Sequence, residues 1–168
     1  MASQSHFGVI VEVNRGIGGH QTAVGEYFKR LKDMTRAAED MRPALEEIHR
    51  QFLMTERGLF GSKGGGKWAP LTAKYLARKV SQGYDPRLMR RTGGLAEALL
   101  TGRGSGAVKE ITADGITMGT NLKEAVFAHR GSGRRRRRLL AYDARRRNRW
   151  TATIRAHLLS EVTPGDDT

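Results

Sequence analysis

One stretch of the chain has the spacing of a known chemical motif. Gly61-Ser-Lys-Gly-Gly-Gly-Lys67 matches the pattern G-x-x-x-x-G-K of a phosphate-binding loop. Such a loop follows a strand, and the residue after its lysine is the Ser or Thr that ligates magnesium. Here Trp68 follows Lys67, and a helical pattern precedes the loop. We therefore expect no nucleotide site and interpret residues 58–67 as a mobile Gly-rich loop, free to reach toward a partner.

The other residue types that could do chemistry form no catalytic pattern. The chain has no cysteine, no Gly-x-Ser-x-Gly turn and no acid pair that stands apart from neighbouring bases. Its histidines lack metal-ligand spacing among themselves or with nearby acids; they are His6, His20, His49, His129 and His157. We expect a protein that is not an enzyme and that holds no cofactor, metal or small-molecule ligand.

Positive charge is concentrated in one segment. The 168 residues carry a formal net charge of +13, and residues 130–149 contain ten arginines and one acid, Asp143. This segment therefore has a charge of +9, which leaves +4 for the other 148 residues. Local basicity of this kind predicts contact with an acidic partner, either nucleic acid or an acidic protein surface. No apolar run is long enough to span a membrane.

The main structural element that the sequence predicts is a long amphipathic helix. We expect a short strand over residues 7–13, and then a helix over 22–57 with Thr22 as its N-cap. Pro43 predicts a kink or break near residues 38–41. The apolar stripe of the helix is Val24, Phe28, Leu31, Ala38, Met41, Leu45, Ile48 and Phe52. A helix of this length has more stripe than a small domain can cover, so we expect part of it to meet another copy. The alternative, that its own domain covers the whole stripe, stays open.

The rest of the chain predicts a small α+β unit. A helix from Leu71 to about Ser81 has an apolar side of Leu71, Tyr75, Leu76 and Val80, which we expect to be buried. A short helix follows over 95–100, and Asp114-Gly115 between two β-rich runs, 108–112 and 116–120, predicts a hairpin.

The C-terminal third begins with a helical or extended passage over 122–129. A closing strand over 139–142 comes next, and Asp143 caps a last helix to about residue 161. Its buried face would be Trp150, Ile154 and Leu158, with His157 beside them. The fold class is therefore α+β: a long kinked N-terminal helix packed on a small antiparallel sheet, with short helices and a C-terminal helix.

Two patches resemble a known family. The first is Phe60, then Trp68-x-Pro70-Leu71-Thr72, Lys79, Leu88 and Thr92-Gly93-x-Leu95; the second is Asp114-Gly-Ile-Thr-Met-Gly119-Thr-Asn121, then Phe127-Ala-His129-x-Gly131. Their order and spacing are similar to those of the tail-completion, or virion morphogenesis, proteins of tailed bacteriophages and the related head–tail neck proteins. Phe127 and Arg130 stand where that family usually has Tyr and Gln. Arg134 to Arg138, with Leu139-Leu140, replace its Pro-x-Arg-Pro-Phe-Leu segment.

The resemblance implies a structural virion protein at the head–tail junction or tail end, assembled in the host cytoplasm. It would form a homo-oligomeric ring, expected to be sixfold, between head-connector and tail terminator or tube proteins. It implies one assembly domain over 1–162, with a family-like core at 68–131, an Arg-rich segment and helix at 132–161, and a disordered tail at 163–168. The signature residues are Trp68, Pro70, Leu71, Thr72, Lys79, Thr92, Gly93, Leu95, Gly119, His129 and Gly131. Trp68 and Leu71 would anchor the long helix to the sheet.

The Arg-rich segment supports an alternative function, nucleic-acid binding. Its arginines would contact DNA phosphates or an acidic partner; they are Arg134, Arg135, Arg136, Arg137, Arg138, Arg145, Arg146, Arg147 and Arg149. Tyr142 and Trp150 are its only aromatic residues, and both have core positions available, so base stacking has little support.

Overall fold

The computed structural model describes residues 20–131, 137–140 and 143–160, and they form the predicted α+β fold. The helices are α1 (His20–Glu39), α2 (Arg42–Gly61), α3 (Ala73–Ser81), α4 (Gly94–Thr101), α5 (Lys123–Arg130) and α6 (Ala144–Ser160), and the strands are β1 (Ala107–Ile111) and β2 (Ile116–Thr120). The predicted strand at 7–13 lies outside the described residues, as do Arg134, Arg135 and Arg136.

The predicted long helix is broken in two, as Pro43 requires. α1 ends at Glu39 and α2 begins at Arg42, with Pro43 in its first turn, where the missing N–H costs nothing. The Met41 N–H donates to the Ala113 carbonyl in the hairpin, 2.8 Å away. Two boundaries differ from the prediction. Thr22 is not the N-cap, because α1 begins at His20, and α2 continues through residues 58–61, which we had assigned to the loop.

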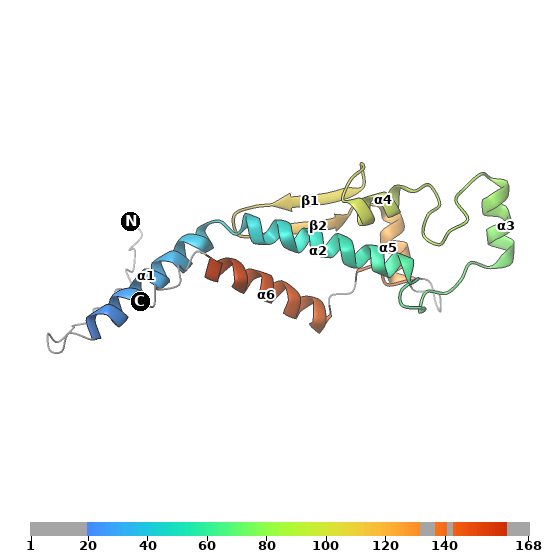
Figure 1. The fold of residues 1–168 in the computed structure, drawn as a ribbon. Helices are drawn as coiled ribbons and strands as arrows, with labels where there is room; N and C mark the ends of the chain where they lie inside the picture. The colour runs from blue at the N-terminus through green and yellow to red at the C-terminus, as the bar shows by residue number, and fades with distance from the viewer. Residues whose placement is uncertain (1–19, 132–136, 141–142, 161–168) are drawn as a thin grey trace, which may run out of the picture.

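α2 is the central element of an elongated molecule (Figure 1). α4 and the hairpin pack on one side of α2, α6 packs on another, and α1 contacts α6. The two strands pair antiparallel with Ile111 opposite Ile116, and the Thr112 N–H donates to the Gly115 carbonyl across the turn. α1 and α3 lie at opposite ends of the molecule (Figure 1).

The core lies between α2, α4 and the segment around Leu139. Its fully packed members are Phe52, Trp68, Leu95, Leu99 and Leu139. Trp68 is buried in this core beside α2, which agrees with the helix side of its predicted role as an anchor: its ring meets Phe60 edge-on at 5.3 Å, and its Nε1–H donates to the Arg138 carbonyl at 3.2 Å. The predicted closing strand is wrong for residues 139–140, which are not in a strand, although Leu139 is almost completely buried; 141–142 lie outside the described residues.

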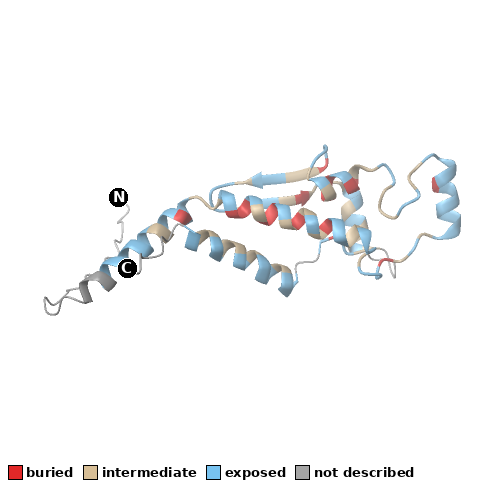
Figure 2. Cartoon of the chain, in the orientation of Figure 1, coloured by how far each residue is buried: buried red, intermediate tan, exposed pale blue. Residues whose placement is uncertain are grey.

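Burial separates the two halves of the long apolar stripe (Figure 2). On α2 the stripe is buried at Leu45, Ile48 and Phe52, whereas on α1 Val24, Phe28 and Leu31 are exposed. The alternative that this domain covers the whole stripe is therefore wrong for the described chain. The contact of the α1 part of the stripe with another copy of the chain stays a prediction.

The predicted burial of α3 is wrong, because the side expected to be buried is exposed. Tyr75, Leu76 and Val80 are exposed, and the one buried residue of α3 is Lys79. α3 projects from the body on two loops, and no other helix or strand of the described chain packs closely against it (Figure 1). On α6 the predicted buried face is half-buried rather than buried. The predicted cap of α6 is confirmed, since Asp143 Oδ1 accepts the Arg146 N–H at 2.8 Å.

Candidate interaction groove

The signature residues gather around one groove of about 660 Å³ between α3 and the pair α4 and α5. Eight of the eleven line it: Pro70, Leu71, Thr72, Lys79, Thr92, Gly93, Leu95 and Gly131. The other three lie elsewhere, with Trp68 in the core, Gly119 buried on β2 and His129 on α5. Leu71 lines the groove and is half-exposed, so its predicted role as an anchor of the long helix is wrong.

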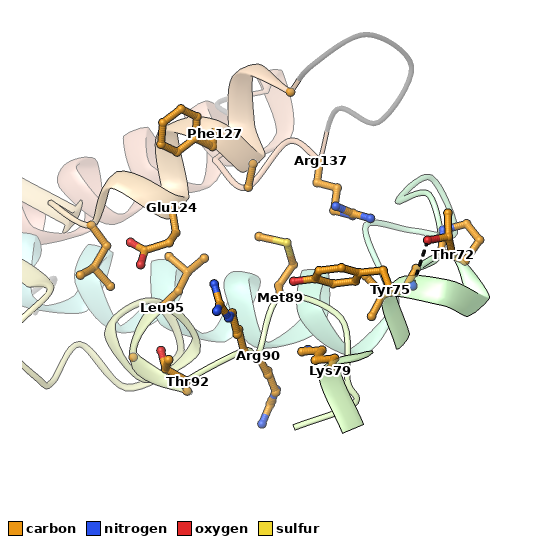
Figure 3. A pocket seen from close by; sticks show the side chains of 18 of the residues that line it. Thr72, Tyr75, Lys79, Met89, Arg90, Thr92, Leu95, Glu124, Phe127 and Arg137 are labelled. Carbon is orange, nitrogen blue, oxygen red and sulfur yellow. Dashed lines mark hydrogen bonds between the residues drawn. The ribbon is translucent and has the colours of Figure 1, made fainter. Parts of the chain in front are cut away.

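α3 forms one wall of the groove and is positioned by its two ends (Figure 3). At the start, Thr72 Oγ1 accepts the Tyr75 N–H at 3.3 Å, which is an N-cap bond. Near the end, Lys79 Nζ donates to the Arg87 carbonyl at 2.7 Å and ties α3 to the following loop. Burial lowers the pKa of Lys79; the nearby Asp85 opposes this effect, and Arg91 adds to it.

The loop after α3 forms the floor and carries its own ion pair. Arg87 donates side-chain and backbone hydrogen bonds to Asp85, and these bonds lower the pKa of the Asp85 carboxyl to about 2. Met89, which lines the groove, has a φ of 60°, a left-handed conformation that costs a non-glycine residue about 1 kcal/mol or more. The guanidinium of Arg91 lies 4.8 Å from the centre of the Tyr84 ring.

The opposite wall combines apolar and polar groups. Glu124 and Phe127 of α5 lie on the opposite side of the groove from Tyr75 and Lys79 of α3 (Figure 3). Phe127 is 74% exposed. Arg137 donates from Nη2 to the Ala69 carbonyl at 2.8 Å, which joins the start of the α3 segment to the chain after α5. An open groove with apolar side chains and several cations suits a bound peptide segment, and the described residues that line it contain no nucleophile paired with a base.

The motif that resembles a phosphate loop has another role. It follows the C-terminal end of α2, where the helix dipole disfavours an anion. The amide of Gly64 donates to the Leu59 carbonyl, and that of Trp68 to the Lys63 carbonyl, so neither is available to a phosphate. A Cβ on Gly64 would lie 2.3 Å from the Trp68 ring. The glycine turn therefore packs against Trp68 and supports it. Its internal hydrogen bonds hold it in one conformation, whereas the sequence predicts a mobile loop.

The sequence did not reveal the one buried ion pair among the described residues. Glu56 on α2 is fully buried, and Arg146 on α6, whose side chain is 11% exposed, lies 3.2 Å from its Oε1. Burial raises the pKa of Glu56 to about 7, and the charge of Arg146 opposes that effect. Glu56 follows Phe52 by four residues, so it lies on the same face of the helix as the apolar stripe. An acid on the apolar face is the sequence feature that could have indicated a buried ion pair.

The pair takes Arg146 out of the set of predicted partner contacts. Arg145, Arg147 and Arg149 are exposed on the same helix, and no carboxylate pairs with them in the described chain. Arg137 and Arg138 contribute to internal hydrogen bonds, through the guanidinium and the backbone carbonyl respectively.

The described residues contain neither a metal-ligand cluster nor a membrane-spanning helix. No cluster of three or more His, Asp or Glu side chains among them could hold a metal ion. None of their helices is long and apolar enough to cross a membrane. No protein-family model, curated protein or solved structure matches this chain.

Proposed function

We propose that this chain is a structural protein of a tailed-bacteriophage virion that forms a homo-oligomeric ring at the head–tail junction. The phage assignment rests on the resemblance of residues 60–131 to tail-completion and neck proteins. One structural observation supports the assembly: apolar side chains are exposed at both ends of the elongated molecule (Figure 1).

The first apolar end is the α1 face formed by Val24, Tyr27, Phe28 and Leu31. Tyr27 is 60% exposed and Phe28 50%, and their rings meet edge-on at 6.0 Å. These positions recur at helical spacing, so they form one contiguous stripe. Contiguous apolar patches of this kind mark protein–protein contacts.

The second apolar end is α3, with Tyr75, Leu76 and Val80 exposed. A contact between two different surfaces at opposite ends is heterologous, because each copy uses one surface on each neighbour. Repeated heterologous contacts produce a closed ring when the rotation per subunit closes, and a filament otherwise. The proposed sixfold ring would place its neighbours, connector and tail terminator or tube proteins, above and below.

The mass of the purified assembly tests this proposal. Native mass spectrometry is expected to give one closed multimer of the 18.6 kDa chain. Phe28→Glu should shift it to single copies, because a carboxylate cannot be buried in the apolar contact without cost. Arg30→Gln is the matched control: it makes the same change in net charge on an exposed position of α1 and should leave the multimer intact. Assembly unchanged by Phe28→Glu would count against the α1 interface.

A second candidate function, nucleic-acid contact, has one observation of its own. Arg145, Arg147 and Arg149 are exposed near the N-terminal end of α6, where the helix dipole disfavours cations. Phosphate groups placed there would remove this cost and pair with the guanidiniums. The two functions are compatible if the ring lines its channel with α6.

Salt dependence tests the second candidate. DNA affinity should fall steeply as salt rises, and replacing Arg145 and Arg147 with Gln should reduce both the affinity and the salt slope. The control is Arg103→Gln, an exposed arginine away from α6. DNA binding that is absent, or that is insensitive to salt, would exclude this function.

A further inference from the structure

The groove and the segment that follows α6 carry opposite charges. Among the described residues that line the groove, Lys79, Arg90, Arg91 and Arg137 are cationic, and Glu124 is the one residue with a carboxylate. Residues 161–168, Glu-Val-Thr-Pro-Gly-Asp-Asp-Thr, contain three acids and no base in a chain with a net charge of +13. They form the most negative stretch of this length in the sequence. We call residues 161–168 the acidic segment.

Two of the groove's cations, Arg90 and Arg91, have no carboxylate partner in the described ranges. The ammonium of Lys79 has three donors, and the Arg87 carbonyl accepts from it. Burial lowers the pKa of Lys79, so its charged form is short of solvation. A carboxylate bound in the groove would stabilise all three cations.

The groove also has the shape and the apolar surface for a peptide. Met89, Leu95 and Phe127 line it between the two helical walls (Figure 3). The acidic segment brings Val162 and Pro164 beside its carboxylates. The arginines of α6, by contrast, stand on the convex surface of a helix, which offers charge but no hollow for apolar side chains.

The acidic segment begins at the end of the molecule opposite the groove. The C-terminal end of α6 lies against the end of α1, since His157 Nε2 is 3.1 Å from the Ala37 carbonyl oxygen and 3.0 Å from that of Asp40. The groove lies at the other end of α2, a helix of about 30 Å. Eight residues span at most about 28 Å when fully extended. The acidic segment of one copy therefore falls short of its own groove.

We infer that the groove binds the acidic segment of a neighbouring copy. The inference rests on the head-to-tail assembly proposed above, which brings the α1 end of one copy, and with it the start of the acidic segment, to the α3 end of the next. The cations of the groove would bind Asp166 and Asp167, and its apolar side chains would contact Val162. The segment would thus link adjacent subunits in addition to the α1 contact.

A labelled peptide tests recognition by the groove. The probe is residues 161–168 with blocked ends, and the protein is the full chain with Asp166→Asn and Asp167→Asn, so that its own segment competes poorly. Fluorescence anisotropy should show binding that weakens about tenfold when Arg90 and Arg91 are replaced by Gln. Replacing Arg145 and Arg147 by Gln, which removes the same charge from α6, should change the affinity little. Absent binding, or an equal loss from the α6 variant, would overturn the inference.

Cross-linking tests whether the occupant comes from a second copy. The chain has no cysteine, so single-cysteine variants react at one site. Copies with Val162→Cys are mixed with size-tagged copies with Phe127→Cys in the groove, and a short bismaleimide is added. Linked pairs should exceed those formed with Arg147→Cys on α6 several-fold.

Native mass spectrometry of the same samples separates the two proposals. A multimer that neither binds the peptide nor cross-links at the groove would overturn this inference and leave the proposed assembly standing. Single copies that bind the peptide without cross-linking would contradict the assembly, and with it the neighbouring copy as the occupant, while the groove would remain an acidic-peptide site.

Discussion

The buried ion pair between Glu56 and Arg146 predicts a stability that depends on pH in a specific way. Burial raises the pKa of Glu56 from 4.5 to about 7 against the opposing charge of Arg146. The folded protein therefore holds this proton more tightly than the unfolded chain does. The contribution of Glu56 to stability is full below about pH 4.5 and is lost as the pH rises through 7. At about 1.4 kcal/mol per pKa unit, the total loss is about 3 kcal/mol.

Arg146→Met makes this dependence steeper. At pH 8 the substitution leaves a buried carboxylate without its cation, which should reduce the free energy of unfolding by about 3–5 kcal/mol. At pH 5 Glu56 is protonated, and the loss should be about 1 kcal/mol, because only a contact of 3.2 Å is removed. The melting temperature should fall by about 6–20 °C at pH 8 and by a few degrees at pH 5.

Urea unfolding at pH 5 and pH 8, at one fixed protein concentration, measures these differences. Arg147→Met is the matched control, since Arg147 is the adjacent arginine and is exposed. Its effect should be below about 0.5 kcal/mol at both values of pH. Adding Glu56→Gln to Arg146→Met should remove the pH dependence of the loss. A loss of equal size at pH 5 and pH 8 would refute the reasoning.

Three further substitutions have matched controls within the chain. Gly64→Ala should reduce the free energy of unfolding by about 2 kcal/mol or more, because its φ is positive and its new Cβ would overlap the tryptophan ring; Gly65→Ala, with a similar φ and open space, should cost about 1 kcal/mol. In the same urea titration, Leu139→Ala should cost about 2–5 kcal/mol and the exposed Leu140→Ala less than about 1 kcal/mol, and equal costs would contradict the assignment of the core. Lys79→Met removes the hydrogen bond from α3 to the Arg87 carbonyl, so amide hydrogen exchange should become faster in the loop over 84–91 and stay unchanged in α2. Unchanged exchange in the loop would show that this hydrogen bond does not hold α3.

Local patterns predicted the elements of the fold well. Pro43 located the break between two helices, because a proline tolerated only in a first turn marks where a helix begins. Asp114-Gly115 located the hairpin within one residue of its strands. Asp143 located the start of α6 through its capping bond. Each of these signals depends on a few neighbouring residues and needs no tertiary information.

Burial could not be predicted in the same way. Helical spacing identified an apolar side on α3, but only the tertiary arrangement determines whether that side is buried, and in the structure Tyr75, Leu76 and Val80 stay exposed. The same limit applies to Lys79 and Glu56, whose buried side chains contact the loop after α3 and helix α6, respectively. The motif at 61–67 matches a phosphate loop in spacing, and the helix that the sequence predicts before it is present as α2.

Electron cryo-microscopy of the purified assembly tests the central claim most directly. The account predicts a closed ring in which the α1 face of each copy meets the α3 end of the next copy, with every subunit in the same environment. A symmetric pair in which α1 packs on α1, or particles of a single copy, would contradict it.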